Sequence, residues 1–440
     1  MRTVRRVSDP RRIWILCAAG ALTVGLALAW RVTRRDPRGG LRANTPTSPA
    51  RQAASFTAPF GNAVPNSSRT APSTASPAGD APESNEDEAA LQRGTAAFQA
   101  GRDAEAVNEF MRVVRTNPRM PIARAYLGLV YVRQKKFAEA MKQFEEEARL
   151  LPNPAFALAH IADVHYAKGD LPSAINALEK ASRLKPDVAQ LHFNLGMLYP
   201  QSLELGKGLE ALNRCLELEP ENHYAQYLRG NLLYKLARLD EAQAGLEESI
   251  RLSPRTGLYH FGLGQVHLRR KGSAENTDRA LSEFQRALDL GAPEPAAVHY
   301  HLGLCYQRMQ DWESSRRELK TSTDMAPEAW GAFYALAETL QKLGRAEDAR
   351  IARARFSVLR QKEDLQMQQR FHEQEVQRNP QSPEARYQLA AFQAKQGDRE
   401  KALRTAASAA DLAKARKAEP SLRDRIAALS AELSRSQGRR

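Results

Sequence analysis

Proline recurs in this chain at an interval that few folds can accommodate. The spacing is 34 residues, four times in succession, at Pro118, Pro152, Pro186, Pro220 and Pro254. Between these prolines, each segment carries two stretches with apolar residues at helical spacing, separated by a short Gly or polar break. Because proline ends a helix, each segment is predicted to form a helix–turn–helix hairpin.

A small residue recurs at the eighth position of each segment, in the first predicted helix. A side chain larger than alanine there would hold the two helices of the hairpin apart. Alanines in the second helix are predicted to mark the matching close approach. The first helices contribute Gly128, Ala162, Gly196, Gly230, Gly264, Gly303 and Ala337, and the second helices Ala140, Ala174, Ala242, Ala280 and Ala349.

These positions resemble the tetratricopeptide repeat (TPR) family, whose 34-residue unit has Leu-Gly, Tyr, Ala, Phe, Ala and Pro at fixed places. One segment reads Leu127-Gly128, Tyr131, Phe137, Ala140, Phe144 and Pro152. The resemblance implies an all-α TPR solenoid of about eight or nine stacked hairpins over residues 87–412. The units are placed at residues 87, 121, 155, 189, 223, 257, 296, 330 and 383.

Three segments depart from the repeat. Extra residues near Lys271–Thr277 predict a longer turn in the sixth unit. Pro200 and Gly208 stand where helix formers are expected, so the fourth hairpin is predicted to be irregular. Residues 345–378 contain neither Pro nor Gly, so the helix there either runs on or bends into an additional one.

The chain carries a net charge of +14, which by itself would indicate a nucleic-acid or membrane partner. The charge lies mainly at the two ends: residues 1–42 hold ten basic and two acidic groups. Residues 413–440 are also basic, and within them 420–436 are predicted to form an amphipathic capping helix. Because the repeats between the ends are nearly neutral, nucleic acid is not expected as a partner.

Residues 13–30 contain no charge and only Thr23 as a polar residue. As a helix they would rise about 27 Å, close to the roughly 30 Å of a bilayer core. We expect a transmembrane signal anchor, preceded by a basic tail at residues 1–12. The alternative is a cleaved signal peptide, because Ala27-Leu28-Ala29 resembles a cleavage site.

Residues 31–86 are predicted to be a disordered linker between this helix and the repeats. From residue 43 the segment is rich in Pro, Ser, Thr and Ala, with no apolar period that could build a core. Arginines flank the apolar segment equally on both sides, so the positive-inside rule gives a tie. We place the repeats outside the cytoplasm, in a bacterial periplasm; the alternatives are a cytoplasmic body and a secreted form.

The apolar segment also carries small residues every four positions. Such a stripe lets two membrane helices approach closely, which would make the protein a homodimer. The alternative is that Ala and Gly are simply common in membrane helices. The stripe consists of Cys17, Ala21, Gly25 and Ala29.

Motifs for catalysis, metals and cofactors are missing from the sequence. No complete phosphate-binding loop is present, and His372-Glu373 lacks the second histidine of a zinc-protease motif, since Val376 stands there. The repeats leave no room for an appended catalytic domain. We therefore expect a protein that is not an enzyme and binds no metal or cofactor.

The histidines of the repeats recur at positions that take large packing residues. His192, His260 and His299 occupy the fourth position of their units, and His165 and His267 the eleventh. We interpret them as packing residues with a polar tip rather than as metal ligands.

In the TPR family the first helix of each hairpin lines a concave groove, and positions 2, 5, 9, 12 and 13 point into it. Aromatic residues there would suit a bound peptide. The alternative is that aromatics at position 5 pack against the neighbouring hairpin. The resemblance implies as groove residues Phe156, Tyr166, Phe193, Tyr224, Tyr227, Asn231, Tyr234, Phe261, Tyr300 and Tyr334.

Position 13 repeats a basic residue, at Lys235, Arg269, Arg308 and Lys342. A row of cations would attract an acidic partner segment. The competing interpretation is that each cation stabilises the C-terminal end of its own helix.

We therefore expect a membrane-tethered adaptor that holds a partner protein or peptide in its groove. The alternative is an accessory or assembly subunit of an envelope enzyme, a secretion complex or a polysaccharide-export complex. Binding of chaperone tails is excluded, because that TPR subtype has Lys at position 5 and no unit here has it.

Overall fold

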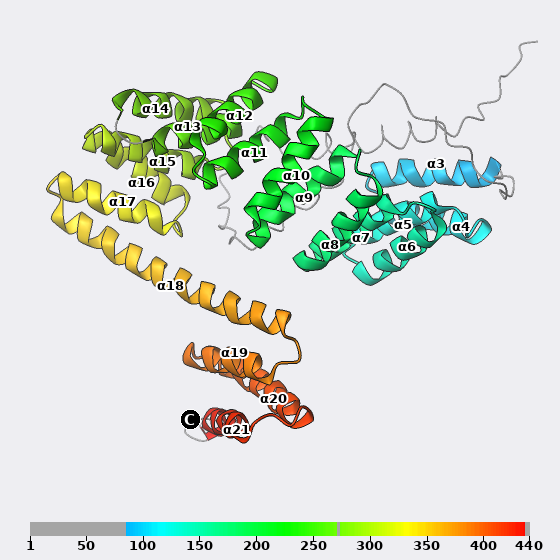
Figure 1. The fold of residues 1–440 in the computed structure, drawn as a ribbon. Helices are drawn as coiled ribbons and strands as arrows, with labels where there is room; N and C mark the ends of the chain where they lie inside the picture. The colour runs from blue at the N-terminus through cyan, green and yellow to red at the C-terminus, as the bar shows by residue number, and fades with distance from the viewer. Residues whose placement is uncertain (1–84, 271–272, 436–440) are drawn as a thin grey trace, which may run out of the picture. The chain divides into compact units, whose positions relative to one another are not determined.

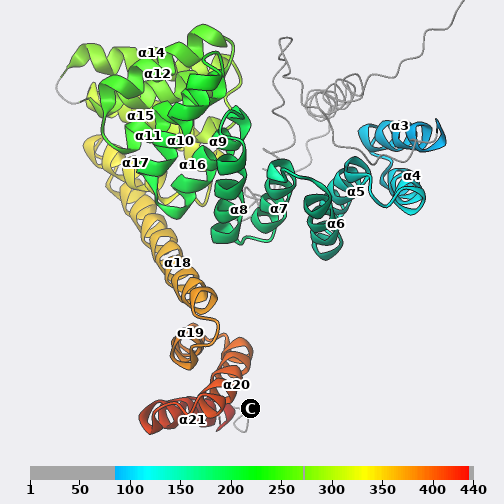
Figure 2. The same ribbon diagram turned by 45° about the vertical axis from the view of Figure 1, so that its right-hand side comes forward.

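A computed structural model of the chain describes residues 85–270 and 273–435 (Figure 1). Every secondary-structure element in these residues is a helix, which confirms the all-α prediction. The described helices belong to two compact units, which divide the chain between Pro293 and Glu294. Figure 2 shows the same helices after a rotation.

Unit 1 contains six consecutive hairpins within the described residues. Its helices are α3 (Asn85–Gln99), α4 (Asp103–Thr116), α5 (Pro121–Arg133), α6 (Phe137–Leu150), α7 (Ala155–Ala167), α8 (Leu171–Leu184), α9 (Ala189–Leu198), the short 3-10 helix η1 (Tyr199–Ser202), α10 (Leu205–Leu218), α11 (His223–Lys235), α12 (Leu239–Leu252), α13 (Gly257–Arg269) and α14 (Ala274–Asp289).

Unit 2 contains three hairpins and a final helix within its described part. Its helices are α15 (Pro295–Arg308), α16 (Trp312–Met325), α17 (Trp330–Lys342), α18 (Ala346–Arg378), α19 (Pro383–Lys395), α20 (Arg399–Ala415) and α21 (Pro420–Arg435). The helix predicted at residues 420–436 is present as α21, which packs on α20 through Leu422 and Ile426; its role as a cap stays a prediction.

The predicted transmembrane helix at residues 13–30 and its small residues lie outside the described part of the chain, as do residues 31–84 of the linker. The predicted end of the linker at residue 86 is two residues too late, because α3 begins at Asn85. Of the helices in residues 85–270 and 273–435, none combines the length and apolar character needed to cross a bilayer. The anchor, the linker and the dimer remain predictions.

The two helices of a hairpin interlock through a glycine and a large side chain. A Cβ atom on Gly264 would lie 2.7 Å from a ring carbon of Phe284, a distance that no real side chain tolerates. The predicted role of the glycine is confirmed, but its contact is not the expected alanine: Ala280 lies one turn before Phe284. The other pairs are Gly94–Phe110, Gly128–Phe144, Gly196–Leu212, Gly230–Leu246 and Gly303–Leu319.

Except in the sixth hairpin, whose turn includes residues outside the described part of the chain, each hairpin turn places one residue in the left-handed region. Within unit 1 these residues are 34 apart: Gly101, Lys135, Gly169, Leu203 and Ala237, with φ between 60° and 80°. The backbone N–H after each of them reaches back to a carbonyl near the end of the first helix, which closes the turn and ends the helix. The turn is therefore the same whether or not glycine occupies it.

The fourth hairpin is irregular, as predicted, and the reason lies at Pro200. Helix α9 ends at Leu198 and the chain continues as the 3-10 turn η1, because proline has no N–H for the helix ladder. Gly208 does not interrupt α10. It makes room for Pro200, since a Cβ at residue 208 would lie 3.1 Å from the proline ring.

Residues 346–378 form the single helix α18, which resolves the two alternatives in favour of a helix that runs on. Its 33 residues span about 50 Å. The first half packs on α17 through Ala349 and Ala352, and Leu359 is also buried. The second half exposes Met367 and Phe371, at 51% and 61%.

Candidate partner-binding surface

The first helices of neighbouring hairpins approach one another directly. Contacts join α3 with α5, α5 with α7, α9 with α11 and α11 with α13 in unit 1, and α15 with α17 in unit 2. Neighbouring second helices, such as α4 and α6, make no comparable approach in the described residues. In a curved stack the tighter row is the inner one, so the first helices form the inner surface of each unit.

The inner surface of unit 1 carries a tyrosine cluster, formed by Tyr224 and Tyr227 of α11 and Tyr259 of α13. The rings of Tyr224 and Tyr227 stack with centroids 5.7 Å apart, and Tyr227 lies 5.1 Å from Tyr259. Tyr259 is buried, which raises the pKa of its phenol. Tyr224 and Tyr227 are half-buried, so their outer edges face solvent. The cluster is a supported aromatic platform.

Phe193 does not belong to the exposed part of this surface. Its side chain is 4% exposed and packs in a core cluster with Leu212, Cys215 and Ala225. Its ring also lies 6.0 Å from that of Tyr224. The structure therefore contradicts its prediction as a groove contact and supports the alternative, packing against the neighbouring hairpin.

Asn231, Tyr234 and Phe261 extend the inner surface beside the tyrosine cluster, and all three are half-buried. Gly262 is buried beneath them: a Cβ added there would lie 3.0 Å from Leu246 Cδ2 and 3.5 Å from both Asn231 Oδ1 and a ring carbon of Tyr227. The structure thus brings an amide and three aromatic residues together on α11 and α13.

Phe156 and Tyr166 lie at the two ends of α7 on the same row. Phe156 is 38% exposed, and the ammonium of Lys185 lies 4.5 Å from its ring centroid. Tyr166 is half-buried, and the Gln201 amide donates to its hydroxyl over 3.5 Å. Both are accessible, but they stand apart from the tyrosine cluster in sequence and on different hairpins.

The basic residues of position 13 are each the last residue of a first helix: Lys235, Arg269, Arg308 and Lys342 end α11, α13, α15 and α17. At this end of a helix, the helix dipole stabilises a positive charge. Arg269 does more, because its guanidinium lies 4.7 Å from the Tyr234 ring centroid and donates to the Tyr234 carbonyl. These contacts favour the structural interpretation of the row over the attraction of an acidic partner.

Unit 2 has a second aromatic group on its inner surface. Tyr334 is 48% exposed, and its ring lies 5.3 Å from that of Phe356. Glu338 accepts a hydrogen bond from the Tyr334 hydroxyl, which raises the pKa of that phenol. Burial raises the pKa of Tyr300, to which the charge of Glu338 also contributes. Both predicted tyrosines of this unit therefore border one carboxylate.

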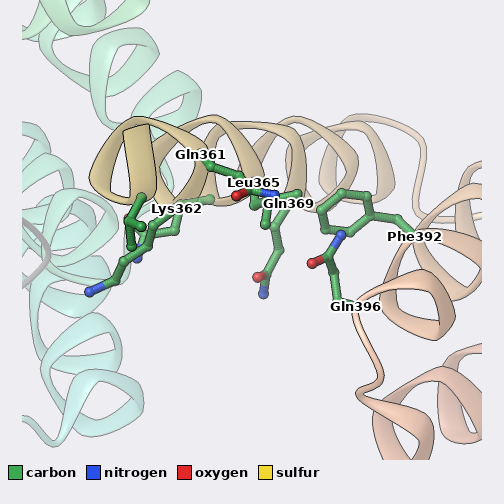
Figure 3. Close-up of a pocket in the computed structure, with 8 residues that line it drawn as sticks. Gln361, Lys362, Leu365, Gln369, Phe392 and Gln396 are labelled. Carbon is green, nitrogen blue, oxygen red and sulfur yellow. The ribbon is translucent and has the colours of Figure 1, made fainter. Parts of the chain in front are cut away.

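A groove in unit 2 was not predicted. It lies between the second half of α18 and helix α19, and its volume is about 440 Å³ (Figure 3). Gln361, Leu365 and Gln369 line it from α18, opposite Phe392 and Gln396 of α19. The sequence signal was the uninterrupted helix at 345–378, but its contact with the ninth hairpin was not inferable from spacing.

The histidines at repeat positions serve packing and hydrogen bonding, as predicted. His260 is 8% exposed, and its two ring nitrogens contact Glu283 at 2.7 Å and the Pro254 carbonyl at 3.3 Å. His192 makes the same contact with the Pro186 carbonyl, at 3.0 Å. Within residues 85–270 and 273–435, no group of three or more metal-ligating residues is assembled.

The two described cysteines are structural. Cys215 and Cys305 are buried, and burial raises the pKa of each thiol to about 12. Because the thiolate is the reactive form, neither is a nucleophile near neutral pH.

Two sequence families match the chain. The "TPR repeat" family matches residues 162–201, and the "Tetratricopeptide repeat" family matches residues 91–154, 227–275, 269–308 and 306–355. Together these segments span more than half of the 440 residues. No curated protein sequence matches the chain.

Solved structures of similar fold share little sequence with it. The crystal structure of the APC/C hetero-tetramer Cut9-Hcn1 is 14% identical with a TM-score of 0.45, and the match covers 61% of this chain and 52% of that one. The chain thus spans about half of that relative's length. A tetratricopeptide repeat protein from Parabacteroides merdae is 17% identical with a TM-score of 0.43, covering 58% and 99%. YrrB, "a TPR protein with an unusual peptide-binding site", is 20% identical with a TM-score of 0.38, covering 43% and 96%.

Proposed function

The chain belongs to the tetratricopeptide repeat family, and from this premise we propose that it is a membrane-tethered scaffold whose inner surface binds a partner protein or peptide. The observation that carries the proposal is the tyrosine cluster with its half-exposed edges. Tyrosine offers large contact area at low entropic cost, and its hydroxyl and the nearby Asn231 amide suit a peptide backbone.

The site we propose is the part of the inner surface built by α11 and α13: Tyr224, Tyr227, Asn231, Tyr234 and Phe261. Buried Tyr259 fixes the cluster from below, because its hydroxyl contacts His223 Nδ1 at 2.6 Å. A platform whose rotamers are already fixed loses little entropy on binding. Isolated aromatic side chains on a surface would lose more rotamer freedom on binding than this cluster does.

The tether is proposed from the sequence of residues 13–30, which are uncharged and long enough to span a bilayer. We place the repeats on the outer side of a bacterial inner membrane, joined through the linker at residues 31–84. The alternative role, as an accessory or assembly subunit of an envelope complex, uses the same surface with one fixed partner.

Site-specific photo-crosslinking of the full chain in isolated membranes tests both parts. A photoreactive amino acid at Lys235, which is exposed at the end of α11, should give crosslinked products. The matched control is Glu247, exposed on the second helix α12, which should give none. One stoichiometric product indicates an assembly subunit, and many peptide products indicate an adaptor.

The two parts fail separately. Equal crosslinking from residues 235 and 247, or none from either, would overturn the inner surface as the binding site. Recovery of the full chain in the soluble fraction would overturn the tether and leave the binding site to be tested on the soluble protein.

A further inference from the structure

A buried carboxylate sits at a position where most other hairpins place small residues, although the first has Val113 and the eighth Phe356. Glu147, on the second helix α6, is 4% exposed and faces the third hairpin. Burying a carboxylate costs free energy unless it has a partner, so this position needs one where the small residues of other hairpins do not. The equivalent residues of other hairpins are Ala181, Cys215, Ser249, Ala287 and Ser322.

The partner of Glu147 is His160, on the first helix of the next hairpin, α7. His160 Nδ1 lies 3.1 Å from Glu147 Oε2, and the imidazole packs on Phe144 with ring centroids 4.9 Å apart. Burial alone would lower the pKa of His160. The hydrogen bond and the charge of Glu147 outweigh it, with help from Asp163, so the pKa is raised. The charged imidazole therefore ties α6 to α7.

Asp163 lies one turn after His160 on α7. Its Oδ1 atom is buried and has no hydrogen-bond partner in the described part of the chain. Burial raises the pKa of this carboxyl to about 7, against a small opposing effect of the His160 charge. The carboxyl is therefore held in its neutral form at mildly acidic pH.

One charged residue on the helices packed against α7 affects the pKa of His160. Helix α7 contacts α5, α6 and α8, and of these only α6 presents a titratable partner, Glu147. The nearby His165 pairs instead with Asp170, at 3.3 Å. The cluster thus consists of Glu147, His160 and Asp163.

We propose that Glu147, His160 and Asp163 form a pH-sensitive lock on the junction between the second and third hairpins, closed in mild acid and weakened in mild base. When the lock is closed, Glu147 binds a protonated imidazole and Asp163 is neutral. Loss of one proton from His160 and one from Asp163 leaves two carboxylates and a neutral imidazole inside the junction.

Both titrations act in the same direction. The folded-state pKa of His160 is raised, so its stabilisation is present below its ordinary value and is lost as pH rises through the folded value. The folded-state pKa of Asp163 is also raised, so folding becomes less favourable as pH rises from about 4 to about 7.

Weakening this junction would release the first two hairpins from the rest of unit 1. On the inner surface this junction lies between α5, which carries Tyr126, and α7, which carries Phe156. Since each hairpin in a repeat array is stabilised by its neighbours, local opening at one seam needs less free energy than global unfolding.

Hydrogen–deuterium exchange of the full chain tests the lock, with rates corrected for the intrinsic effect of pH. Between about pH 6 and about pH 8, protection of α6 and α7 should fall about tenfold from the ionisation of Asp163 alone. Protection of α11 and α12, read in the same experiment, should change little. In Asp163→Asn the fall in α6 and α7 should shrink to the part that His160 contributes, because the amide cannot ionise.

The matched control is Asp187→Asn, the same chemical change at an exposed residue of the turn after α8. It should retain the wild-type pH dependence. A second variant, Glu147→Ala combined with His160→Phe, keeps a ring on Phe144 and removes the imidazole together with its buried carboxylate partner, so the fall that remains should be that of Asp163 alone. The proposal is overturned if wild type and Asp163→Asn lose the same protection, or if α6 and α7 respond to pH no more than α11 and α12.

Discussion

The second and eighth hairpins use the same turn but different packing between their helices. In the second, Gly128 of α5 receives the ring of Phe144 from α6. In the eighth, the same two positions hold Ala337 and Arg353, and Arg353 is exposed. The eighth hairpin thus lacks the interlock that six other hairpins of the described chain share.

The two hairpins also end differently. Helix α6 stops at Leu150, shortly before Pro152, whereas α18 continues for 33 residues until Pro380 follows it. The glycine–large pair therefore sets how closely two helices approach, and proline sets where the second helix ends. These are separate controls, and the eighth hairpin has lost both.

The largest effect should come from filling the glycine pocket of the second hairpin. Gly128→Ala places a Cβ against the Phe144 ring, and overpacking of this kind should lower the free energy of unfolding by about 2 kcal/mol. Urea denaturation would measure it. The matched control is Gly245→Ala on α12, where the nearest atom is 3.5 Å away. That change should be neutral or stabilising, because alanine is the better helix former.

If both alanine variants behave alike, the interlock does not distinguish the second hairpin from the eighth.

A smaller effect of opposite sign is expected at the turns. Leu203 adopts φ 66° and is 85% exposed, so it bears the left-handed strain with no packing in return. Leu203→Gly should raise the free energy of unfolding by about 1 kcal/mol. The eighth hairpin offers the reverse experiment, Gly344→Leu, at φ 74°. A loss of similar size there, by the same denaturation assay, would show that the turn is the shared element; no change in either variant would contradict it.

The smallest effect should be on the exposed half of α18. Phe371 is 61% exposed, so Phe371→Ser should change the free energy of unfolding by less than about 0.5 kcal/mol. Phe392 on α19 is 9% exposed, and Phe392→Ser should cost several times more. A comparable loss from both substitutions would mean that α18 packs more tightly than its exposure indicates.

Repeat spacing predicted the hairpins, the irregular turn at Pro200 and the final helix, because Gly and Pro act locally on the backbone. It did not predict which inner-surface aromatics are accessible. Phe193 and Tyr227 share a repeat position, yet one is buried and the other half-exposed, since the neighbouring hairpin decides the outcome.

Other features could not be predicted because they depend on contacts between hairpins. Arg269 bonds a carbonyl 35 residues earlier, so its role was visible in sequence only as a charge at a helix end. The Glu147 cluster was missed because the conspicuous signal, a carboxylate at a position of small residues, appears only when the second helices are aligned with one another. The groove beside α18 had only the uninterrupted helix at residues 345–378 as its sequence signal, because spacing does not show which hairpin that helix packs on.

The arginines at position 13 give the row of hairpins a polarity. Arg133 donates to the Phe98 carbonyl over 2.9 Å with its guanidinium 4.1 Å from the Phe98 ring, and Arg269 does the same for Tyr234. In both cases the later hairpin adds a charged donor to a carbonyl in the last turn of the earlier hairpin's first helix, a carbonyl that already accepts a backbone N–H from its own turn. A chain emerging from the ribosome would accordingly close each of these turns by itself and gain the arginine contact only once the following hairpin has been made.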